Sequence, residues 1–238
     1  MKSGLITKRG VRGCFFVLLV FFIYALAGNA LASSPRGDDF TLTILHLNDT
    51  HSHLDPSIIS YTCENRSYKA ELGGFSYLGT VVNDLRREEG HLLFLHGGDM
   101  VQGTLYFTKY QGQADIDLLN ALGVDAATLG NHDFDQGTAV TAKLADAAAF
   151  PFISANVDVS QDPVLVGKVK PYFIKSFAGE QIAIIGATTH YTAELSRPGS
   201  RVSFLEVAPR VAATVPERSR QRASTRSFCL PISAMMKI

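Results

Sequence analysis

The stretch His91-Leu92-Leu93-Phe94-Leu95-His96-Gly97-Gly98-Asp99 decides the fold class of this chain. Its first six residues form a short and nearly continuous apolar run, which is typical of a strand in a sheet covered on both faces. The run ends in two glycines, which let the backbone turn sharply, and in a carboxylate. A buried strand that ends in a polar loop favours an α/β domain with a site at the strand ends.

Two other apolar runs end in the same way. Phe40–Leu47 alternates, is rich in β-forming residues, and is followed by Asn48-Asp49-Thr50-His51. Ala126–Leu129 is followed by Gly130-Asn131-His132-Asp133-Phe134-Asp135. Because ligands of open α/β sheets bind at the carboxyl ends of the strands, the three polar segments are expected to gather there.

The segments between these runs supply the other elements of an α/β domain. A helical pattern follows Gly73-Gly74, with Phe75, Leu78, Val81, Val82 and Leu85 on one face. Asp55–Ala70 is expected to be an irregular polar insertion. The remaining predictions are helices at Ala114–Leu122 and Thr138–Ala149, a strand at Phe152–Ala155, and a hairpin in which Tyr172–Phe177 and Gln181–Ile185 flank Ala178-Gly179-Glu180.

The polar segments contain residue types that bind divalent cations. Asp, His and Asn supply oxygen and nitrogen ligands suited to Zn, Mn, Mg or Ca. Asp49 and His51 are one residue apart, so both side chains can point the same way from an extended strand end. Asp99 is a candidate to bridge two ions, and the side-chain oxygen of Asn131 is a candidate ligand of the second. Each motif alone is weak, because aspartates in turns and satisfied histidines are more common. His46 and His53 are weaker candidates.

An ion bound at these residues could activate water against a phosphate ester. His132 is then the candidate proton donor to the phosphoryl group or to the departing oxygen of that ester. Asp135, three residues later, is placed to orient the imidazole and to raise its basicity. The alternative is that Asn131 caps a helix whose first turn holds Asp133 or Asp135. Asp133 is expected to have such a capping role, because adjacent side chains diverge in direction.

Both ends of the chain are predicted to lie outside this domain. Residues 1–32 have a basic start, an apolar run from Cys14 to Gly28 and small residues at Ala30 and Ala32, the pattern of a secretory signal cleaved after Ala32. An uncleaved anchor is the alternative. Residues 33–39 are expected to be a flexible lead-in, and residues 208–238 an irregular basic tail. A nucleic-acid-binding arm is disfavoured there, because nothing aromatic or periodic supports it.

The signal predicts export to the periplasm or the extracellular space, with no stable membrane anchor after cleavage. A formal net charge of zero gives no reason to expect nucleic acid as a partner. Cleavage would leave Cys63 and Cys229. An oxidising compartment permits a bridge between them, two free thiols are at least as compatible with their spacing, and neither belongs to a metal motif.

From about Leu42 to about Glu206 the chain resembles the secreted 5′-nucleotidase and UDP-sugar hydrolase family, within the calcineurin-like metallophosphoesterases. The Asn-His and Gly-Gly-Asp motifs belong to the wider superfamily, whereas the Gln-Gly-Thr and Phe-Asp continuations point to the nucleotidase branch. The matching segments are Ile44-Leu45-His46-Leu47-Asn48-Asp49-Thr50-His51, Gly97-Gly98-Asp99, Gln102-Gly103-Thr104, Leu129-Gly130-Asn131-His132-Asp133-Phe134-Asp135, Ser154-Ala155-Asn156 and Ile184-Ile185-Gly186-Ala187-Thr188-Thr189.

This resemblance implies a two-sheet sandwich flanked by helices over residues 40–207, with a site for two divalent metal ions. It implies that Asp49 and His51 bind one ion, that Asp99 bridges both, and that Asn131 binds the second ion and faces the substrate. By the same likeness His132, assisted by Asp135, stabilises the transition state while water attacks phosphorus. The implied substrate is a small-molecule phosphate ester, most simply a nucleotide.

The chain also departs from the family pattern. Family members supply further histidines in segments resembling Thr-His and Gly-His-x-His, and a C-terminal domain whose aromatic residues stack on the base. Beyond His132 this chain has only His190, so the domain is expected to be incomplete at its C-terminal side. The sequence therefore predicts an exported, metal-dependent phosphate ester hydrolase of the 5′-nucleotidase type. The alternatives are a truncated, non-catalytic fragment of such an enzyme and an exported binding module without turnover.

Overall fold

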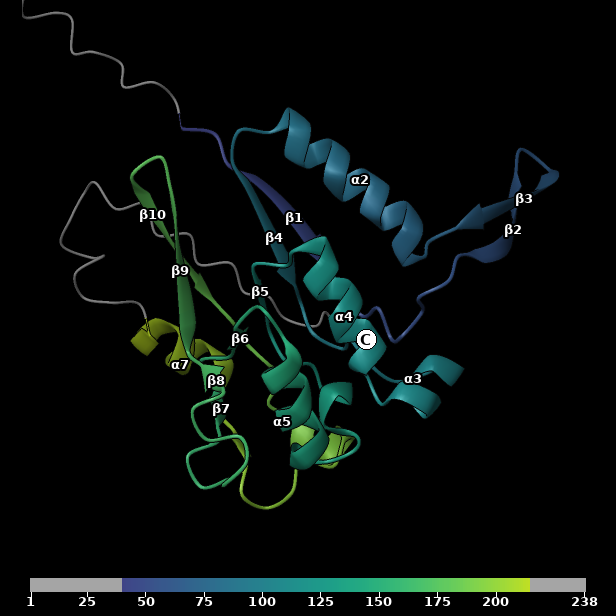
Figure 1. Cartoon of the computed structure of the whole chain (residues 1–238). Helices are drawn as coiled ribbons and strands as arrows, with labels where there is room; N and C mark the ends of the chain where they lie inside the picture. The colour runs from purple at the N-terminus through teal and green to yellow at the C-terminus, as the bar shows by residue number, and fades with distance from the viewer. Residues whose placement is uncertain (1–39, 215–238) are drawn as a thin grey trace, which may run out of the picture. The chain divides into compact units, whose positions relative to one another are not determined.

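A computed structural model describes residues 40–214 of the 238-residue chain, and its helices and strands belong to the unit that begins at Leu42 (Figure 1). Strand β1 (Thr43–Leu47) pairs in parallel with β4 (Leu92–His96). Among the described residues, the parallel sheet has the strand order β1-β4-β5-β6-β8, in which the last three are β5 (Ala126–Ala127), β6 (Phe152–Ile153) and β8 (Val169–Lys170). The predicted α/β class is therefore confirmed.

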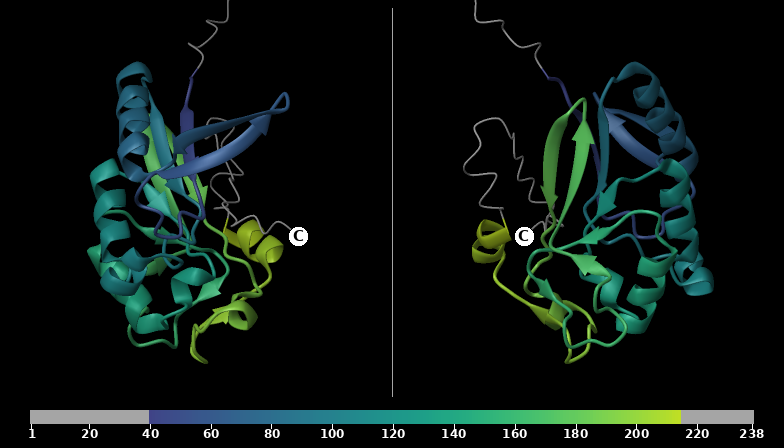
Figure 2. Two further views of the ribbon diagram at one scale, coloured as in Figure 1. Left: turned by 90° about the vertical axis from the view of Figure 1, so that its right-hand side faces the viewer. Right: turned by 60° about the vertical axis from the view of Figure 1, so that its left-hand side comes forward.

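Different elements cover the two faces of the sheet. Figure 2 shows the helices on one face and the antiparallel pair of β9 (Tyr172–Phe177) and β10 (Glu180–Ile185) on the other. The helices are α2 (Phe75–Glu88), α4 (Gln113–Leu122) and α5 (Thr138–Ala147). Cover on both faces explains why β4 is an apolar run, because successive side chains of a strand point to opposite faces. Phe94 joins the core cluster of the helices, while the equally buried Leu93 and Leu95 point to the opposite face.

The helix predictions are confirmed, with small corrections. Helix α4 ends at Gly123, whose left-handed conformation (φ 68°) lets its N–H bond to the carbonyls of Leu119 and Asn120. In α2, Phe75 and Val82 are buried, but Val81 is 51% exposed, although the sequence analysis placed it on the apolar face. Adjacent helical residues point about 100° apart, so Val81 cannot share the buried face of Val82.

Two hairpins have two-residue loops whose residues both have positive φ, as type I′ turns require. The loop Ala178-Gly179 joins β9 and β10, which confirms the predicted hairpin. The loop Glu64-Asn65 joins β2 (Ser57–Cys63) to β3 (Arg66–Leu72), where the sequence analysis expected an irregular insertion. That prediction is wrong, because a Glu-Asn loop is a weaker turn signal than one that contains glycine.

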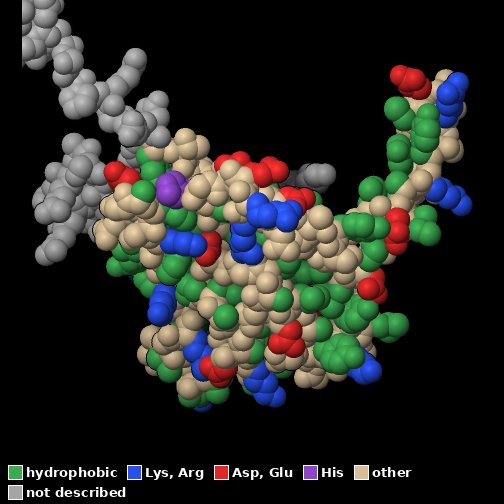
Figure 3. Space-filling view, turned by 45° about the horizontal axis from the view of Figure 1, so that its top comes forward, with side chains coloured by type: hydrophobic (Ala, Val, Ile, Leu, Met, Phe, Trp, Pro, Cys, Tyr) green, Lys and Arg blue, Asp and Glu red, His purple; other side chains and the backbone are tan. Residues whose placement is uncertain are grey.

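Hairpin β2–β3 carries an apolar face that remains exposed. The register puts Tyr61 opposite Tyr68 and Ile59 opposite Ala70, so these side chains share one face. The rings of Tyr61 and Tyr68 stack with centroids 5.5 Å apart, and both side chains are more than 40% exposed. Figure 3 shows this apolar surface on the arm that extends from the right-hand side of the molecule.

Several short elements were not predicted. They are α3 (Leu105–Tyr110), the 3₁₀ helix η1 (His132–Phe134), α6 (Thr192–Leu195) and the antiparallel pair of β7 (Val157–Asp158) and β11 (Ser203–Phe204). Helix α7 (Val207–Thr214) occupies the beginning of the segment that was expected to be an irregular tail. The irregular-tail prediction is therefore wrong for residues 208–214, whose alanine-rich sequence favours a helix.

Other predictions fall on residues that the structure does not describe. They concern the signal at residues 1–32, the lead-in at 33–39, Cys229 and the tail after residue 214. Cys63 is described, and it is an exposed free thiol. Within residues 40–214, no helix has the length and apolar content needed to cross a membrane.

Candidate metal centre

The first two polar segments meet because the pairing of β1 with β4 continues past the ends of both strands. The N–H of Asp49 donates to the carbonyl of Gly98 at 3.0 Å, and the N–H of His51 donates to the carbonyl of Asp99 at 3.1 Å. Asp49, His51 and Asp99 all have positive φ, near 50°. This conformation is uncommon for residues other than glycine and is found at functional sites. The predicted gathering of these segments is therefore confirmed.

The third segment reaches the site through a close approach of two glycines. A Cβ atom on Gly98 would lie 2.4 Å from the nitrogen of Gly130, and one on Gly130 would lie 2.1 Å from Oδ1 of Asp99. Neither position has room for a side chain. Glycine is therefore required at positions 98 and 130, because a side chain at either position would keep Asp99 away from the loop that carries Asn131 and His132.

Asp133 fastens these two loops together. Its Oδ2 accepts hydrogen bonds from the N–H groups of Asp99 at 3.0 Å and Gly130 at 2.8 Å, and its Oδ1 accepts one from Met100 at 3.0 Å. Burial, followed by the charge of Asp99, raises the pKa of Asp133, and the three N–H groups oppose that rise. The sequence analysis expected Asp133 to cap its own segment. Asp133 instead joins two loops, because two of its three donors lie in the segment after β4.

The donor atoms of His51, Asp99 and His132 lie within 4.8 Å of one another. Oδ1 of Asp49 is 3.7 Å from Nε2 of His51, at the edge of the same cluster. Nδ1 of His51 is buried and has no hydrogen-bond partner among the described residues. A buried nitrogen without a hydrogen-bond partner is costly in itself, and a cation would satisfy it, so these residues fit a divalent metal ion.

Asp99 has one oxygen available for a cation. Its Oδ1 accepts the backbone N–H of His132 at 2.8 Å, and its Oδ2 accepts no hydrogen bond from the residues that the structure describes. The side chain is only 3% exposed, and burial raises the pKa of Asp99 against the lowering effect of the His132 N–H. A bound cation would favour the ionised carboxylate.

His132 and Asp135 form the pair that the sequence predicted. Nδ1 of His132 is 2.7 Å from Oδ2 of Asp135, and Oδ1 of Asp135 accepts the hydroxyl of Ser196 at 2.7 Å. Burial of the ring lowers the pKa of His132, but the bond to Asp135 and the charges of Asp99, Asp135 and Asp133 outweigh it, so the net pKa is raised. With Nδ1 engaged, the proton on Nε2 is the one that can be transferred.

Asn131 precedes η1, but its side chain makes no capping bond there, so the helix-cap alternative is wrong for this residue. Its side chain is half-buried and makes no hydrogen bond to the residues that the structure describes. The weaker candidates lie outside the three-residue group: His46 is exposed on β1, and Nδ1 of the exposed His53 bonds to the carbonyl of His51 at 3.0 Å.

His96 is a positioning residue that the sequence analysis missed. Its Nδ1 accepts the N–H of Gly98 at 3.2 Å, so Nε2 carries the proton and contacts the hydroxyl of Thr50 at 3.2 Å. That hydroxyl donates in turn to the carbonyl of Met100 at 3.2 Å. Burial, followed by the charges of His46 and His51, lowers the pKa of His96 to about 3, which keeps the ring neutral. The signal in the sequence was a polar residue at the end of a buried strand.

A second buried network supports the third segment. The hydroxyl of Thr188 donates to the carbonyl of Leu129 at 2.7 Å, directly before Gly130. Asn156 is fully buried, and its amide donates to the carbonyls of Thr188 at 2.7 Å and Leu205 at 2.8 Å. The Ser154-Ala155-Asn156 and Thr188 motifs therefore have a structural role, which connects β6 and β10 to the loop of Asn131.

Known proteins are similar to this chain in sequence and in fold. Residues 42–195 match the family described as calcineurin-like phosphoesterase. The chain is 42% identical over 166 residues to the NAD 5′-nucleotidase of Haemophilus influenzae, covering 69% of this chain and 28% of that protein. It is 40% identical over 175 residues to the 5′-nucleotidase of Bos taurus, covering 71% of this chain and 30% of that protein.

Solved structures give the same picture. The structure of the H. influenzae NAD nucleotidase has a TM-score of 0.74 and 37% identity, covering 81% of this chain and 34% of that one. The 5′-nucleotidase precursor of Thermus thermophilus has a TM-score of 0.73 and 36% identity, covering 82% and 37%. The chain thus spans about a third of the length of these relatives.

Proposed function

The chain belongs to the calcineurin-like phosphoesterase family, and we propose that it hydrolyses nucleotide-type phosphate esters with two divalent cations. The observation that carries the proposal is the cluster of His51, Asp99 and His132, whose donor atoms lie within 4.8 Å, with Asp135 bonded to His132. The nucleotide-type substrate is proposed because relatives of this chain are named 5′-nucleotidases.

In this proposal Asp49 and His51 would hold one cation, Asn131 would hold the second, and Asp99 would contribute to both. The second oxygen of Asp99, which accepts no bond from the described residues, supports a bridging role. Cations at such a site lower the pKa of water toward neutrality and offset the negative charge that develops on the phosphoryl group. The identity of the metal is left open, because Asp, His and Asn suit several ions.

We assign His132 to proton donation rather than to permanent metal ligation. The bond from Nδ1 to Asp135 at 2.7 Å orients the ring, and in the metal-free chain that carboxylate helps to raise the pKa of His132, as a proton donor requires. Asp135 fixes Nδ1, so Nε2 is left to donate a proton to a phosphoryl oxygen or to the departing ester oxygen. Ser196 keeps Asp135 in place by donating to its other oxygen.

The test is phosphate release by the full chain with Mn²⁺ or Zn²⁺, from AMP and from a chromogenic phosphate diester. His132→Ala is expected to lower the rate by about 100-fold or more, the usual scale for a general acid. Asp99→Ala is expected to lower it at least as much, because it removes a proposed metal ligand. His190→Ala is the matched control, because His190 contacts Glu206 at 3.7 Å and lies outside the cluster. Release that persists in both variants or in excess chelator would contradict the proposal. A cooperative thermal transition without release would favour a binding module.

We also propose that residues 1–32 direct export and are cleaved after Ala32. The basic start, the apolar run and the small residues before the cleavage point support this proposal. Mass measurement of the mature product in the secreted or periplasmic fraction tests it. A product that retains residue 1 and stays with the membranes would support the anchor alternative.

A further inference from the structure

The imidazole ring of His51 has no hydrogen bond to the described residues that would fix its orientation. Its buried Nδ1 has no partner among them, and its Nε2 is 3.7 Å from Oδ1 of Asp49, which is too far for a hydrogen bond. A metal-binding histidine is usually oriented by a hydrogen bond at its other ring nitrogen. The direction of the His51 side chain therefore depends mainly on how its backbone is held.

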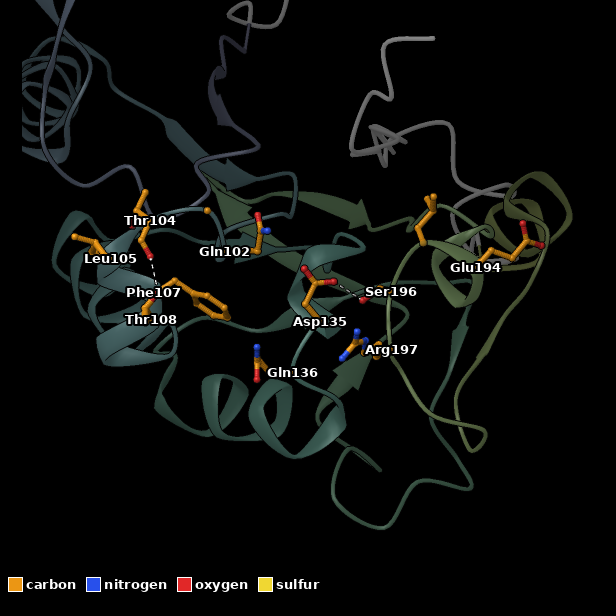
Figure 4. A pocket seen from close by; sticks show the side chains of 12 residues that line it. Gln102, Thr104, Leu105, Phe107, Thr108, Asp135, Gln136, Glu194, Ser196 and Arg197 are labelled. Carbon is orange, nitrogen blue, oxygen red and sulfur yellow. Dashed lines mark hydrogen bonds between the residues drawn. The ribbon is translucent and has the colours of Figure 1, made fainter.

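The next residue, Ser52, is fully buried and is bonded to three parts of the fold. Its N–H donates to the carbonyl of Met100, in the loop after β4, at 3.0 Å. Its hydroxyl donates to Oδ2 of Asp115, in the first turn of α4, at 3.0 Å. Its carbonyl accepts the hydroxyl of Thr104 at 2.9 Å. In Figure 4, Thr104 lies where the chain enters α3, beside a cavity of about 840 Å³.

These bonds hold a backbone conformation that is uncommon for residues with a side chain. The φ angles of His51 and Ser52 are 45° and 52°, both in the left-handed region. Such a conformation persists only where the surrounding structure holds it in place. The bonds of Ser52 are therefore placed to determine the direction in which the His51 side chain leaves the chain.

Asp115 is the least expected of the partners of Ser52, because it is a carboxylate with 0% exposure. Its Oδ1 has no hydrogen-bond partner among the described residues, and its only side-chain donor within them is the hydroxyl of Ser52. Burial of a carboxylate with incomplete hydrogen bonding is costly, and an apolar residue of similar volume would avoid that cost. Such a group calls for an explanation other than stability.

We propose that Asp115 is a positioning residue of the metal centre, which fixes the direction of His51 through the hydroxyl of Ser52. The inference rests on the proposed function, because it takes His51 to hold a cation. Asp115 lies outside the group of His51, Asp99 and His132, so its effect on the cation passes through the turn at Ser52. It makes the affinity of the site depend on helix α4.

Two variants of Asp115 test this role by the affinity of the full chain for Mn²⁺, measured by electron paramagnetic resonance. Asp115→Leu keeps a similar volume but removes the acceptor of the Ser52 hydroxyl. It is expected to weaken Mn²⁺ binding about 10-fold, the lower end of the effect of losing groups that orient a metal ligand. Asp115→Asn keeps an oxygen that can accept this hydroxyl, so Mn²⁺ affinity is expected to stay within about threefold.

A double-mutant cycle shows whether the two residues act through their common bond. Ser52→Ala removes the donor and is also expected to weaken Mn²⁺ binding about 10-fold. If both changes act by breaking one bond, the double variant is expected to lose about the same 10-fold, whereas independent effects would multiply to about 100-fold. Thr104→Val removes a different bond to Ser52 from a half-buried side chain, and is expected to weaken Mn²⁺ binding about threefold even if Asp115→Leu does not fold.

Asp162→Ala is the matched control for a general loss of stability. Asp162 is also a buried aspartate, but its Oδ1 accepts the N–H groups of Val164 at 3.0 Å and Leu165 at 2.9 Å, away from the three polar segments. This variant is expected to lower the melting temperature and to leave Mn²⁺ affinity within about twofold.

Hydrogen exchange of the metal-free chain tests the turn itself. Exchange at the N–H groups of His51 and Ser52 is expected to become about 5- to 10-fold faster in Asp115→Leu, the scale of one lost hydrogen bond, and to change less in Asp162→Ala. Unchanged exchange at both groups would contradict the positioning role, whether or not a metal binds.

The outcomes separate the positioning role from the proposed activity. Mn²⁺ affinities that follow the expected pattern, without phosphate release, would support the role and contradict the activity. Phosphate release by a chain whose Mn²⁺ affinity is unchanged in Asp115→Leu and Ser52→Ala would overturn the role alone. An equal loss in Asp115→Asn and Asp115→Leu, or a loss of about 100-fold in the double variant, would also overturn it. A parent chain that binds no Mn²⁺ would contradict both.

Discussion

Replacing Gly130 by alanine tests the contact that brings the second and third polar segments together. A Cβ at this position would lie 2.1 Å from Oδ1 of Asp99 and 2.5 Å from both its Cγ and its backbone nitrogen. Unstrained contacts between heavy atoms lie near about 3.5 Å, so the carboxylate and its loop must move by roughly 1 Å. Asp99 would then lose its geometry with the N–H of His132, which is now 2.8 Å away.

The size of the effect follows from this overlap. Overpacking of a buried position destabilises by about 1–3 kcal/mol. A change of 1 kcal/mol moves the melting temperature of a domain of this size by about 2–4 °C, so a fall of about 2 to 12 °C is expected. Mn²⁺ affinity is expected to fall about 10- to 100-fold, as it does when the groups that orient a metal ligand are disturbed.

Calorimetric melting of the chelated chain and Mn²⁺ titration measure the two effects separately. Gly90→Ala is the matched control, because a Cβ there would have no atom within 4 Å, and neither Gly90 nor Gly130 has a positive φ. The control is expected to change stability by less than about 1 kcal/mol. If Gly130→Ala has the same melting temperature and the same Mn²⁺ affinity as the control, the close approach of the loops is wrong.

Three other changes probe other parts of the site. Asp135→Asn is expected to lower the pKa of His132, because the carboxylate of Asp135 helps to raise it in the parent. The midpoint of an NMR titration of the metal-free His132 ring should therefore move to lower pH. An unchanged midpoint would exclude this effect of Asp135. Burial raises the pKa of Asp115 from 3.8 to about 6, so its contribution to stability is lost as pH rises through that window. In urea unfolding, the stability of Asp115→Asn minus that of the parent is therefore expected to rise by up to about 3 kcal/mol from pH 4 to pH 7.5. The same difference at both pH values would contradict the raised pKa. Removal of metal ions with a chelator should lower the melting temperature of the parent, since a ligand at about 100 times its Kd stabilises by about 2.7 kcal/mol. The same treatment should hardly change that of His51→Ala, which lacks a proposed ligand. Equal shifts in both proteins would place the ion elsewhere.

The sequence predicted the elements whose signals are local and repeated. The continuous apolar run of β4 and the glycine after α4 each correspond to one physical requirement, burial on both faces and a left-handed cap. Hairpin β2–β3 was missed because apolar side chains such as Ile58 and Tyr61 are exposed on it, so no burial pattern marked the strands. Propensity alone cannot identify a strand that has no core to pack against.

The candidate site was predictable in composition but not in geometry. Asp49, Asp99 and His132 were expected to lie together because each follows a strand, and the cluster confirms the gathering of Asp99 with His132. The bonds of Asp133 to Asp99 and Met100 and the contact of His96 with Thr50 were not predictable, because they join residues 33 to 46 positions apart in sequence. Tertiary contacts of this kind leave no periodic trace in the chain.

The proposed metal ligands are therefore held in place by the backbone more than by side-chain packing. Asp49, His51 and Asp99 have a left-handed conformation that costs roughly 1–2 kcal/mol for each residue with a side chain. This cost is offset by the bonds from Asp49 and His51 to the loop of Asp99, and by the carboxylate of Asp133 on the nitrogen of Asp99. A chain with the same Asp, His and Asn residues, but without Gly98, Gly130 and Asp133, would retain the ligand types and lose the arrangement that lets them share an ion.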